Sequence, residues 1–362
     1  MNRNNPGIDR LLETIFNKAG DVFTVDHSGI AAEIDRNPQA YSNIFIKILS
    51  AIGGFLATLA LLGFLLLAGL YNSEPTMVVL GALMSAAAVF TSRLANHVFL
   101  DTAVLTVYVA GLCLAGFGIA EVADNGDAAI GCCLLLSVAG ILFSRGFMMT
   151  MVSVLVANGC LIAYCSGHAV VSILPSLPLV FSGFALLVIT LKESWIITRS
   201  VWLNKLFRPL QTGFFISFLC GLAWVLHGDV FGIYAGIADI RLLSVAGDVL
   251  VLIMVYKIVT AQQVVNTVYV AAIYAFTLLI LAAVFFAPGI SGSLFLLLLS
   301  VYYGYKAEVA VSIAALGYFI VKFYYSLQMN LLVKSGLLIA PGVLLILLWF
   351  FFQKQLKEHE EI

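Results

Sequence analysis

Apolar blocks of about 17–25 residues recur along almost the whole chain, from Ile44 to Phe352. Each block is long enough for a helix to cross a hydrocarbon core of roughly 30 Å. Hydrocarbon cannot hydrogen-bond a bare backbone, so blocks of this length form helices. The composition agrees, because 62% of the residues are apolar and 10% are charged, and the mean hydropathy is +1.07. We therefore expect an all-α, polytopic transmembrane helix bundle.

The blocks predict about twelve spans, with ten or eleven as the alternatives because three blocks are short. The short blocks lie near 76–92, 128–144 and 290–304, and each is a candidate for a tilted, re-entrant or merged segment. The other predicted spans lie near 44–71, 98–120, 147–166, 170–191, 209–227, 241–260, 266–287, 307–324 and 333–353.

The distribution of lysine and arginine predicts the orientation, because short cytoplasmic loops retain positive charge. With the amino terminus in the cytoplasm, every Lys and Arg falls on the cytoplasmic side except Arg241, Lys322 and Lys334. The loops on the opposite side are neutral or acidic. We therefore predict that both termini are cytoplasmic and that the number of spans is even.

Three regions follow from these spans. Residues 1–43 form a cytoplasmic N-terminal arm, 44–353 the transmembrane helical domain, and 354–362 a cytoplasmic tail. Apolar residues at helical spacing between 8 and 19 predict a short amphipathic helix in the arm. This helix either docks a partner or the membrane surface, or folds back under the bundle.

Ionisable side chains inside apolar spans are the first candidates for a function, because each costs a few kcal/mol unless it finds a partner or water. Asp101 lies about one turn inside the third predicted span, and Asp248 about two turns inside the eighth. Ser244 and Arg241 precede Asp248 on the same stripe of helix. Either aspartate is a candidate proton or cation site. Either one instead satisfies a neighbouring helix or an interfacial arginine.

Two Ala-Pro-Gly triplets interrupt the C-terminal hydrophobic region, one containing Pro288 and Gly289, the other Pro341 and Gly342. Proline removes a backbone donor and glycine permits unusual dihedral angles, so each triplet predicts a helix break. In transporters, such breaks expose backbone dipoles to a substrate near the middle of the bilayer. In other membrane proteins, the same residues make kinks and close helix contacts.

The densest polar cluster lies near the C-terminus, and we select from it Lys322, Tyr325, Gln328, Lys334 and Ser335 as candidate binding or transport residues. On the predicted topology this segment faces the exterior, where lysine is otherwise rare. A lysine flanked by tyrosines and amides predicts a site for a phosphate or carboxylate. The alternative is that the lysines reach for lipid headgroups or cap carbonyl groups.

The segment from Tyr324 to Gly336, continued through Ile339 and Gly342, resembles the ending of a bacterial inner-membrane family, domain of unknown function 4401. The pattern of that family is approximately YYxLxxxLLxKSxxLxxxG. Pro341 stands where the family more often has a small residue. The resemblance implies a multi-pass protein of the bacterial inner (cytoplasmic) membrane, with a second small membrane protein encoded nearby as its partner. It implies no activity.

Three classes of function fit a chain of this kind. An enzyme acting on a lipid-linked substrate is disfavoured, because the common hydrolase, metalloprotease and phosphate-loop motifs are missing, and we predict no catalytic residue. The cysteines and histidines show no metal-ligand spacing, so we predict no metal or cofactor. A net charge of −1 argues against nucleic acid as a partner.

The two remaining classes are a transporter and a non-catalytic subunit. The number of spans favours a transporter-like protein for a small or amphiphilic anionic substrate, because an anchor needs far fewer helices. The scarcity of buried charge favours a membrane subunit or scaffold that holds a partner membrane protein. We prefer the transporter, with the subunit as the alternative.

Overall fold

The computed structural model describes residues 73–93, 98–144, 146–168, 176–226, 237–263, 267–285 and 287–326, with scattered positions between 53 and 69. This part of the chain consists of helices joined by short connections and contains no strand. In chain order the helices are α4 (Glu74–Thr91), α5 (Val98–Ala123), α6 (Gly126–Phe143), α7 (Phe147–Gly167), α8 (Leu177–Leu191), α9 (Glu193–Arg199), α10 (Val201–Leu226), α11 (Ile237–Ala261), α12 (Thr267–Ala283), α13 (Pro288–Tyr303) and α14 (Lys306–Ser326).

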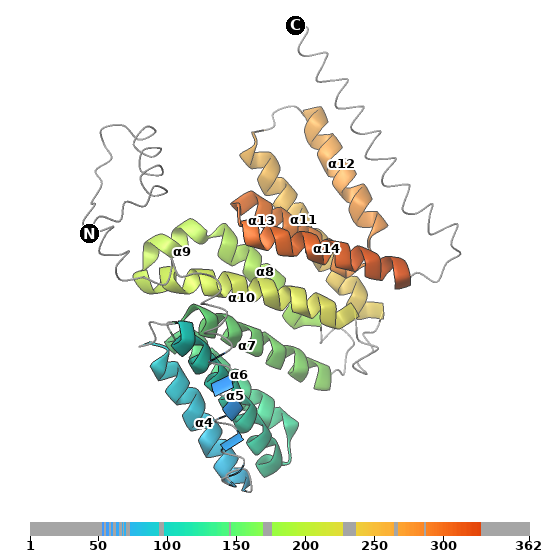
Figure 1. Cartoon of the computed structure of the whole chain (residues 1–362). Coiled ribbons are helices and arrows are strands. Elements are labelled where there is room, and N and C mark those ends of the chain that lie inside the picture. Colours follow the sequence, from blue (N-terminus) through green and yellow to red (C-terminus); the bar gives the residue numbers. More distant parts are fainter. Residues whose placement is uncertain are drawn as a thin grey trace, which may run out of the picture.

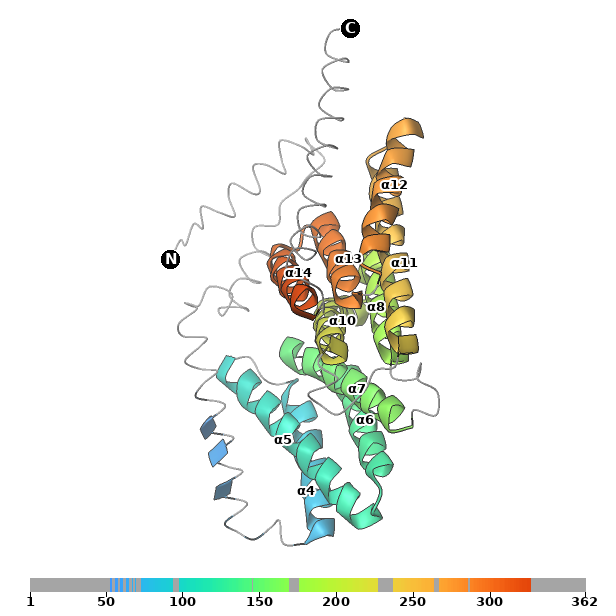
Figure 2. The same ribbon diagram turned by 90° about the vertical axis from the view of Figure 1, so that its right-hand side faces the viewer.

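The described helices lie in two groups, α4 to α7 and α8 to α14 (Figures 1 and 2). Helices α7 and α10 pack against each other where the groups meet. Helix α10 is the most enclosed of the long helices and also contacts α8, α9 and α13. The second group encloses the largest apolar core, in which the rings of Phe218 and Phe295 meet edge to face with centroids 6.0 Å apart.

Seven of the described helices are long and apolar enough to cross a membrane: α4, α5, α6, α7, α10, α11 and α14. Helices α8 and α9 meet at a bend of 67° and make an eighth candidate span as a pair, while α12 and α13 are shorter apolar helices. The predicted all-helical class is therefore confirmed for the described residues. The predicted span at 333–353, most of the one at 44–71, and both termini lie outside them.

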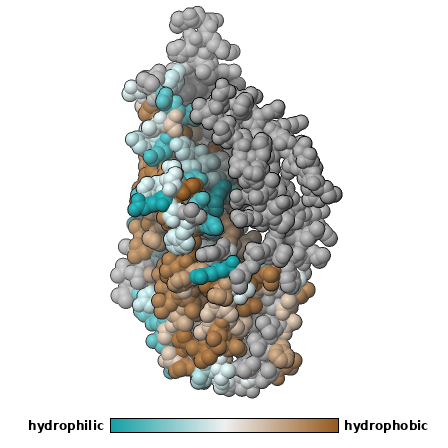
Figure 3. Space-filling view, turned by 90° about the vertical axis from the view of Figure 1, so that its left-hand side faces the viewer, coloured by the Kyte–Doolittle hydropathy of each residue, from teal (hydrophilic) through white to brown (hydrophobic). Residues whose placement is uncertain are grey.

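The surface of the described helices is apolar over wide areas, as Figure 3 shows for one face. Large side chains such as Leu83, Phe90, Phe117 and Leu135 are each more than 60% exposed. A protein in water rarely exposes so much contiguous apolar surface. These helices are therefore suited to lipid as their surrounding solvent.

Helix α10 begins at Val201, not near residue 209 as the sequence predicted. The predicted span near 209–227 therefore covers only part of this helix. Ser200 precedes the helix, and its Oγ accepts a hydrogen bond from the Trp202 amide at 3.3 Å. Pro209 lies inside the helix, where it removes a single backbone donor.

Helices α4 and α5 approach each other closely because glycines lie at their contact. A Cβ atom on Gly81 would lie 2.4 Å from the Ala115 amide nitrogen, and one on Gly111 would lie 2.6 Å from Ser85 Oγ. Small residues let two helix backbones pack in a bilayer, where the hydrophobic effect does not drive helices together. This contact holds α4 against α5 within the first group of helices.

We expect Gly81→Ala to destabilise the protein by about 1–3 kcal/mol, because the added methyl group forces the two backbones apart. The matched control is Gly159→Ala in α7, where an added Cβ meets no atom within 4 Å. Thermal melting of the detergent-purified variants measures the difference. Equal melting temperatures for Gly81→Ala and the wild-type protein would contradict this account of the contact.

Candidate functional site

The start of α13 is buried inside the second group of helices. Pro288 opens the helix, and every residue from Ala287 to Ser293 is buried. No side chain caps this helix end. The chain thus breaks between α12 and α13, and Pro288 and Gly289 form the first turn of α13 within the protein interior.

Helix α11 passes directly beside this buried helix start. A Cβ atom on Gly247 would lie 2.6 Å from Ser291 Oγ and 3.6 Å from the Gly292 amide nitrogen. Gly247 lies about 15 Å along α11 from its first residue, close to the middle of the helix. The first turn of α13 therefore lies level with the middle of a candidate membrane span.

Ser244 lies one turn before Gly247 on the same face of α11. Asp248 lies one turn after Ser244 and follows Gly247 in the chain, about 100° further round the helix. The Asp248 side chain is half-buried, and its Oδ1 is buried without a hydrogen-bond partner. Ser244 is fully buried, and its Oγ also lacks a partner. Among the described residues no ion pair joins Asp248 to Arg241, whose side chain is exposed.

The surroundings of this face contain little charge. Helices α8, α12 and α13 pack against α11, and none of them contains a charged residue. The hydroxyl groups of Ser291 and Ser293 donate to carbonyl groups of their own helix, at 3.3 Å and 3.0 Å. The partial positive charge of the α13 N-terminus is therefore the nearest source of positive potential for a negative group here. We take Ser244, Asp248 and the start of α13 as the candidate site, whose chemically active features are a carboxyl group and a helix N-terminus.

Asp101 belongs to a different part of the structure. It lies half-buried in the first turn of α5, which packs mainly against α4, α6 and α7. On the same helix, Tyr108 is fully buried, donates to the Leu136 carbonyl at 3.2 Å and accepts from Ser153 at 3.1 Å. The structure thus does not bring the two predicted aspartates together.

The C-terminal candidates are described only in part. Lys322 is half-buried and Tyr325 is 75% exposed, both in the last turns of α14. Gln328, Lys334 and Ser335 lie outside the described residues, so the anion site predicted there stays a prediction. The helix break predicted at Pro341 and Gly342 also lies outside them.

A polar network that the sequence did not predict joins three helices at the other end of α13. Tyr305, in the turn before α14, donates to the Glu193 carboxylate at the start of α9 at 2.8 Å. The Arg208 guanidinium of α10 lies over the Tyr305 ring, 4.2 Å from its centroid. Arg208 also donates to the Gln211 side chain at 3.1 Å, and Gln211 donates to Glu308 of α14 at 3.3 Å.

Gln211 is the centre of this network, since its side chain is fully buried and bonds two charged groups. Burial, together with the hydrogen bond to Glu193, raises the pKa of the Tyr305 hydroxyl, so Tyr305 remains a donor. The network, Glu193–Tyr305–Arg208–Gln211–Glu308, therefore ties the α13–α14 turn to α9 and α10.

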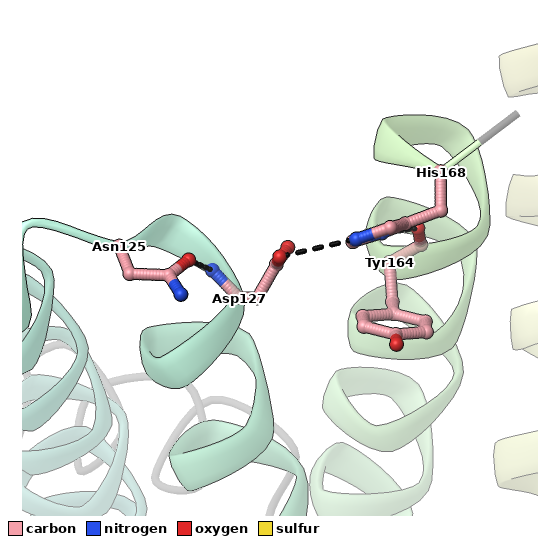
Figure 4. A network of polar contacts seen from close by, with 4 residues as sticks. All are labelled: Asn125, Asp127, Tyr164 and His168. Atoms are coloured by element: carbon pink, nitrogen blue, oxygen red, sulfur yellow. Dashed lines mark hydrogen bonds and ion pairs between the residues drawn. The ribbon is translucent and has the colours of Figure 1, made fainter.

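A second polar contact joins the start of α6 to the end of α7 (Figure 4). The His168 Nε2 lies 3.1 Å from the Asp127 carboxylate, and Asn125 accepts from the Asp127 amide at 2.9 Å. The His168 ring also lies against Tyr164, with centroids 4.5 Å apart. Because both side chains are partly exposed, this pair contributes little to stability.

We expect Gln211→Leu to destabilise the protein by about 1–3 kcal/mol, because it leaves the half-buried Glu308 carboxylate without its donor. Tyr305→Phe is the milder comparison, since it keeps a ring beneath Arg208 and loses only the bond to Glu193. Thermal melting of the purified variants ranks them. A larger loss for Tyr305→Phe than for Gln211→Leu would show that Gln211 is not the centre of the network.

The chain was compared with protein families, curated proteins and solved structures. The model of one family, a domain of unknown function (DUF4401), matches residues 43–355. No curated protein and no solved structure shows significant similarity to the chain. The family match covers nearly the whole length, including every helix described above. The chain therefore belongs to the DUF4401 family.

Proposed function

We propose that the protein is a transporter of the bacterial inner membrane that carries a small or amphiphilic anion. In this proposal about twelve helices cross the membrane and both termini are cytoplasmic, as the asymmetry of Lys and Arg favours. The anion binds at the start of α13, where the helix dipole and the Gly289 N–H favour negative charge.

The buried helix start level with the middle of α11 is the observation that supports this proposal most. In an ordinary span, a helix begins at the membrane surface, where water satisfies its first N–H groups. A helix that begins at mid-depth keeps its positive dipole end inside the protein. At the start of α13 the Ala287 and Ile290 amides already donate to the Val284 and Ala287 carbonyl groups, and Pro288 has no N–H, so a ligand would meet the Gly289 N–H and the helix dipole. Helix α13 has 16 residues and is thus about 24 Å long, too short for a typical complete span.

The polar network at the far end of α13 supports a closed state on that side. On the predicted topology this end is cytoplasmic, since Lys192, Arg199, Lys205 and Lys306 lie near it in the sequence. We propose that the network is the cytoplasmic gate. Its hydrogen bonds hold the α13–α14 turn against α9 and α10, and they break when the site opens to the cytoplasm.

The alternative is a non-catalytic subunit that holds a second membrane protein. The apolar outer surface of α14, which contains Val311, Ile313 and Val321, is the feature that favours it. A partner helix would cover this surface in place of lipid. Co-purification of a second membrane protein, without any anion exchange, is the result expected for a subunit.

Anion counterflow into proteoliposomes tests the transporter. The probes are labelled inorganic phosphate, succinate, benzoate and dodecyl phosphate, each preloaded in unlabelled form. We expect the wild-type protein to exchange at least one of them. Gly247→Leu should abolish this exchange, because its side chain projects against Ser291 at the start of α13.

Gly159→Leu is the matched control, since residue 159 is exposed on α7 with open space around it, and it should exchange as the wild type does. Both variants are first checked for a monodisperse, folded protein. Failure of the wild-type protein to exchange any probe would contradict the proposal, and so would full exchange by Gly247→Leu.

A second prediction concerns the C-terminal signature. If Lys334 binds the anion at the exterior entrance, Lys334→Gln should reduce counterflow at least tenfold, a loss of about 1.4 kcal/mol of binding free energy. The amount of protein in the membrane should stay unchanged. A fall in membrane abundance with normal counterflow per molecule would instead assign Lys334 to packing or topology.

A further inference from the structure

The geometry points to Asp248 as a proton site that controls whether the start of α13 accepts an anion. This inference rests on the proposed transport of an anion and names its coupling ion. When Asp248 carries a proton, the α13 N-terminus is free for the substrate. When Asp248 is ionised, its own negative charge occupies the same positive end.

The first argument is that one helix N-terminus cannot serve two negative groups. Its partial charge is about half a unit, and its influence ends within the first turn. Gly247 approaches that turn at Ser291 and Gly292, and the carboxyl group of Asp248, about 100° further round α11, has one oxygen atom buried. Because like charges in a medium of low dielectric constant disfavour each other strongly, an anion at this position and an ionised Asp248 exclude each other.

The second argument is that no positively charged side chain on the neighbouring helices offsets the repulsion between the bound anion and an ionised Asp248. Helices α8, α12 and α13 contain no Asp, Glu, Lys, Arg or His. On α11, Arg241 and Lys257 lie about 10 Å and 14 Å from Asp248 along the helix axis, and both are exposed. The remaining titratable groups of these four helices are Asp239, Tyr256, Tyr269, Tyr274, Tyr302 and Tyr303.

The third argument is the pair of buried oxygen atoms without partners. Asp248 Oδ1 and Ser244 Oγ are unsatisfied on adjacent turns of one helix face. Most other buried hydroxyl groups of the described helices bond to carbonyl groups, as Thr190 does to Leu186 at 2.7 Å. Asn158, Ser166 and Ser312 also keep an unsatisfied oxygen atom, but none of them has a second one within a turn of its helix. An unsatisfied fully buried hydroxyl beside an unsatisfied carboxylate is what a site without its ligand leaves behind.

The transport cycle then balances as one proton with one negative charge. The proton enters from the side to which the site is open and binds Asp248. The anion follows to the start of α13, with Ser244 as an added donor. On the opposite side both leave, so that a monovalent anion crosses without net movement of charge.

Anion-dependent thermal stabilisation of the purified protein tests this coupling, with phosphate, succinate, benzoate and dodecyl phosphate as probes across a range of pH. For the wild-type protein, we expect the apparent affinity to fall about tenfold for each pH unit above the titration of Asp248. For Asp248→Asn, which mimics the protonated form, the affinity should stay high and nearly constant. Asp101→Asn should behave as the wild type, since Asp101 lies on α5.

Ser244→Ala is the second variant, because it leaves the carboxyl group in place. It should weaken anion binding about fivefold, the equivalent of one neutral hydrogen bond, while the pH slope remains. Anion binding that is independent of pH in the wild-type protein would overturn the proton coupling and leave the transporter intact. A pH slope that persists in Asp248→Asn would do the same. If no probe stabilises either protein at any pH, the anion site itself is absent and both proposals fall.

Discussion

Hydrocarbon offers no hydrogen-bond partner, so each polar side chain within these helices has to find one inside the protein. Most do so on their own helix, where Ser182, Thr190 and Ser300 donate to a carbonyl group three or four residues earlier. Five described side chains keep a buried oxygen atom unsatisfied, and among them Ser244 and Asp248 lie one turn apart on the same helix. The cost of such atoms, about 1–3 kcal/mol each, is tolerated more readily where a ligand recovers it.

Helix α13 connects the two polar features of the second group of helices. Its first turn lies beside Gly247, and its last residue is two positions before Tyr305 in the network with Arg208 and Glu193. Because α13 is a continuous helix of about 24 Å, a displacement of one end also moves the other end. The coupling between site and gate in our proposal therefore needs no rearrangement inside the helix, only a shift of the whole element against α10 and α11.

The all-helical class of the described residues was predictable from the sequence, because length and composition decide whether a block can span a bilayer, whereas the count of about twelve spans stays a prediction. The sequence also drew attention to Asp248, since a carboxylate in an apolar block is visible without a structure. The approach of its neighbour Gly247 to Ser291 of α13 was not predictable, because these two residues lie on different helices far apart in the sequence. The network was missed because its charged residues resemble ordinary interfacial charges at span ends. Gln211, an amide early in an apolar span, was the one available signal.

Gly304 fixes the end of α13 through its left-handed conformation, with φ at 74°. The Tyr305 amide bonds back to the Ser300 carbonyl at 3.0 Å, which completes a Schellman motif. The length of α13 therefore fixes both the distance and the relative rotation between its two ends. One residue more or fewer within it would turn Tyr305 by about 100° relative to Ser291 and shift it by about 1.5 Å. Insertions and deletions should consequently be confined to the connections of this protein, while the spacing from Pro288 to Gly304 stays constant wherever the same two ends have to act together.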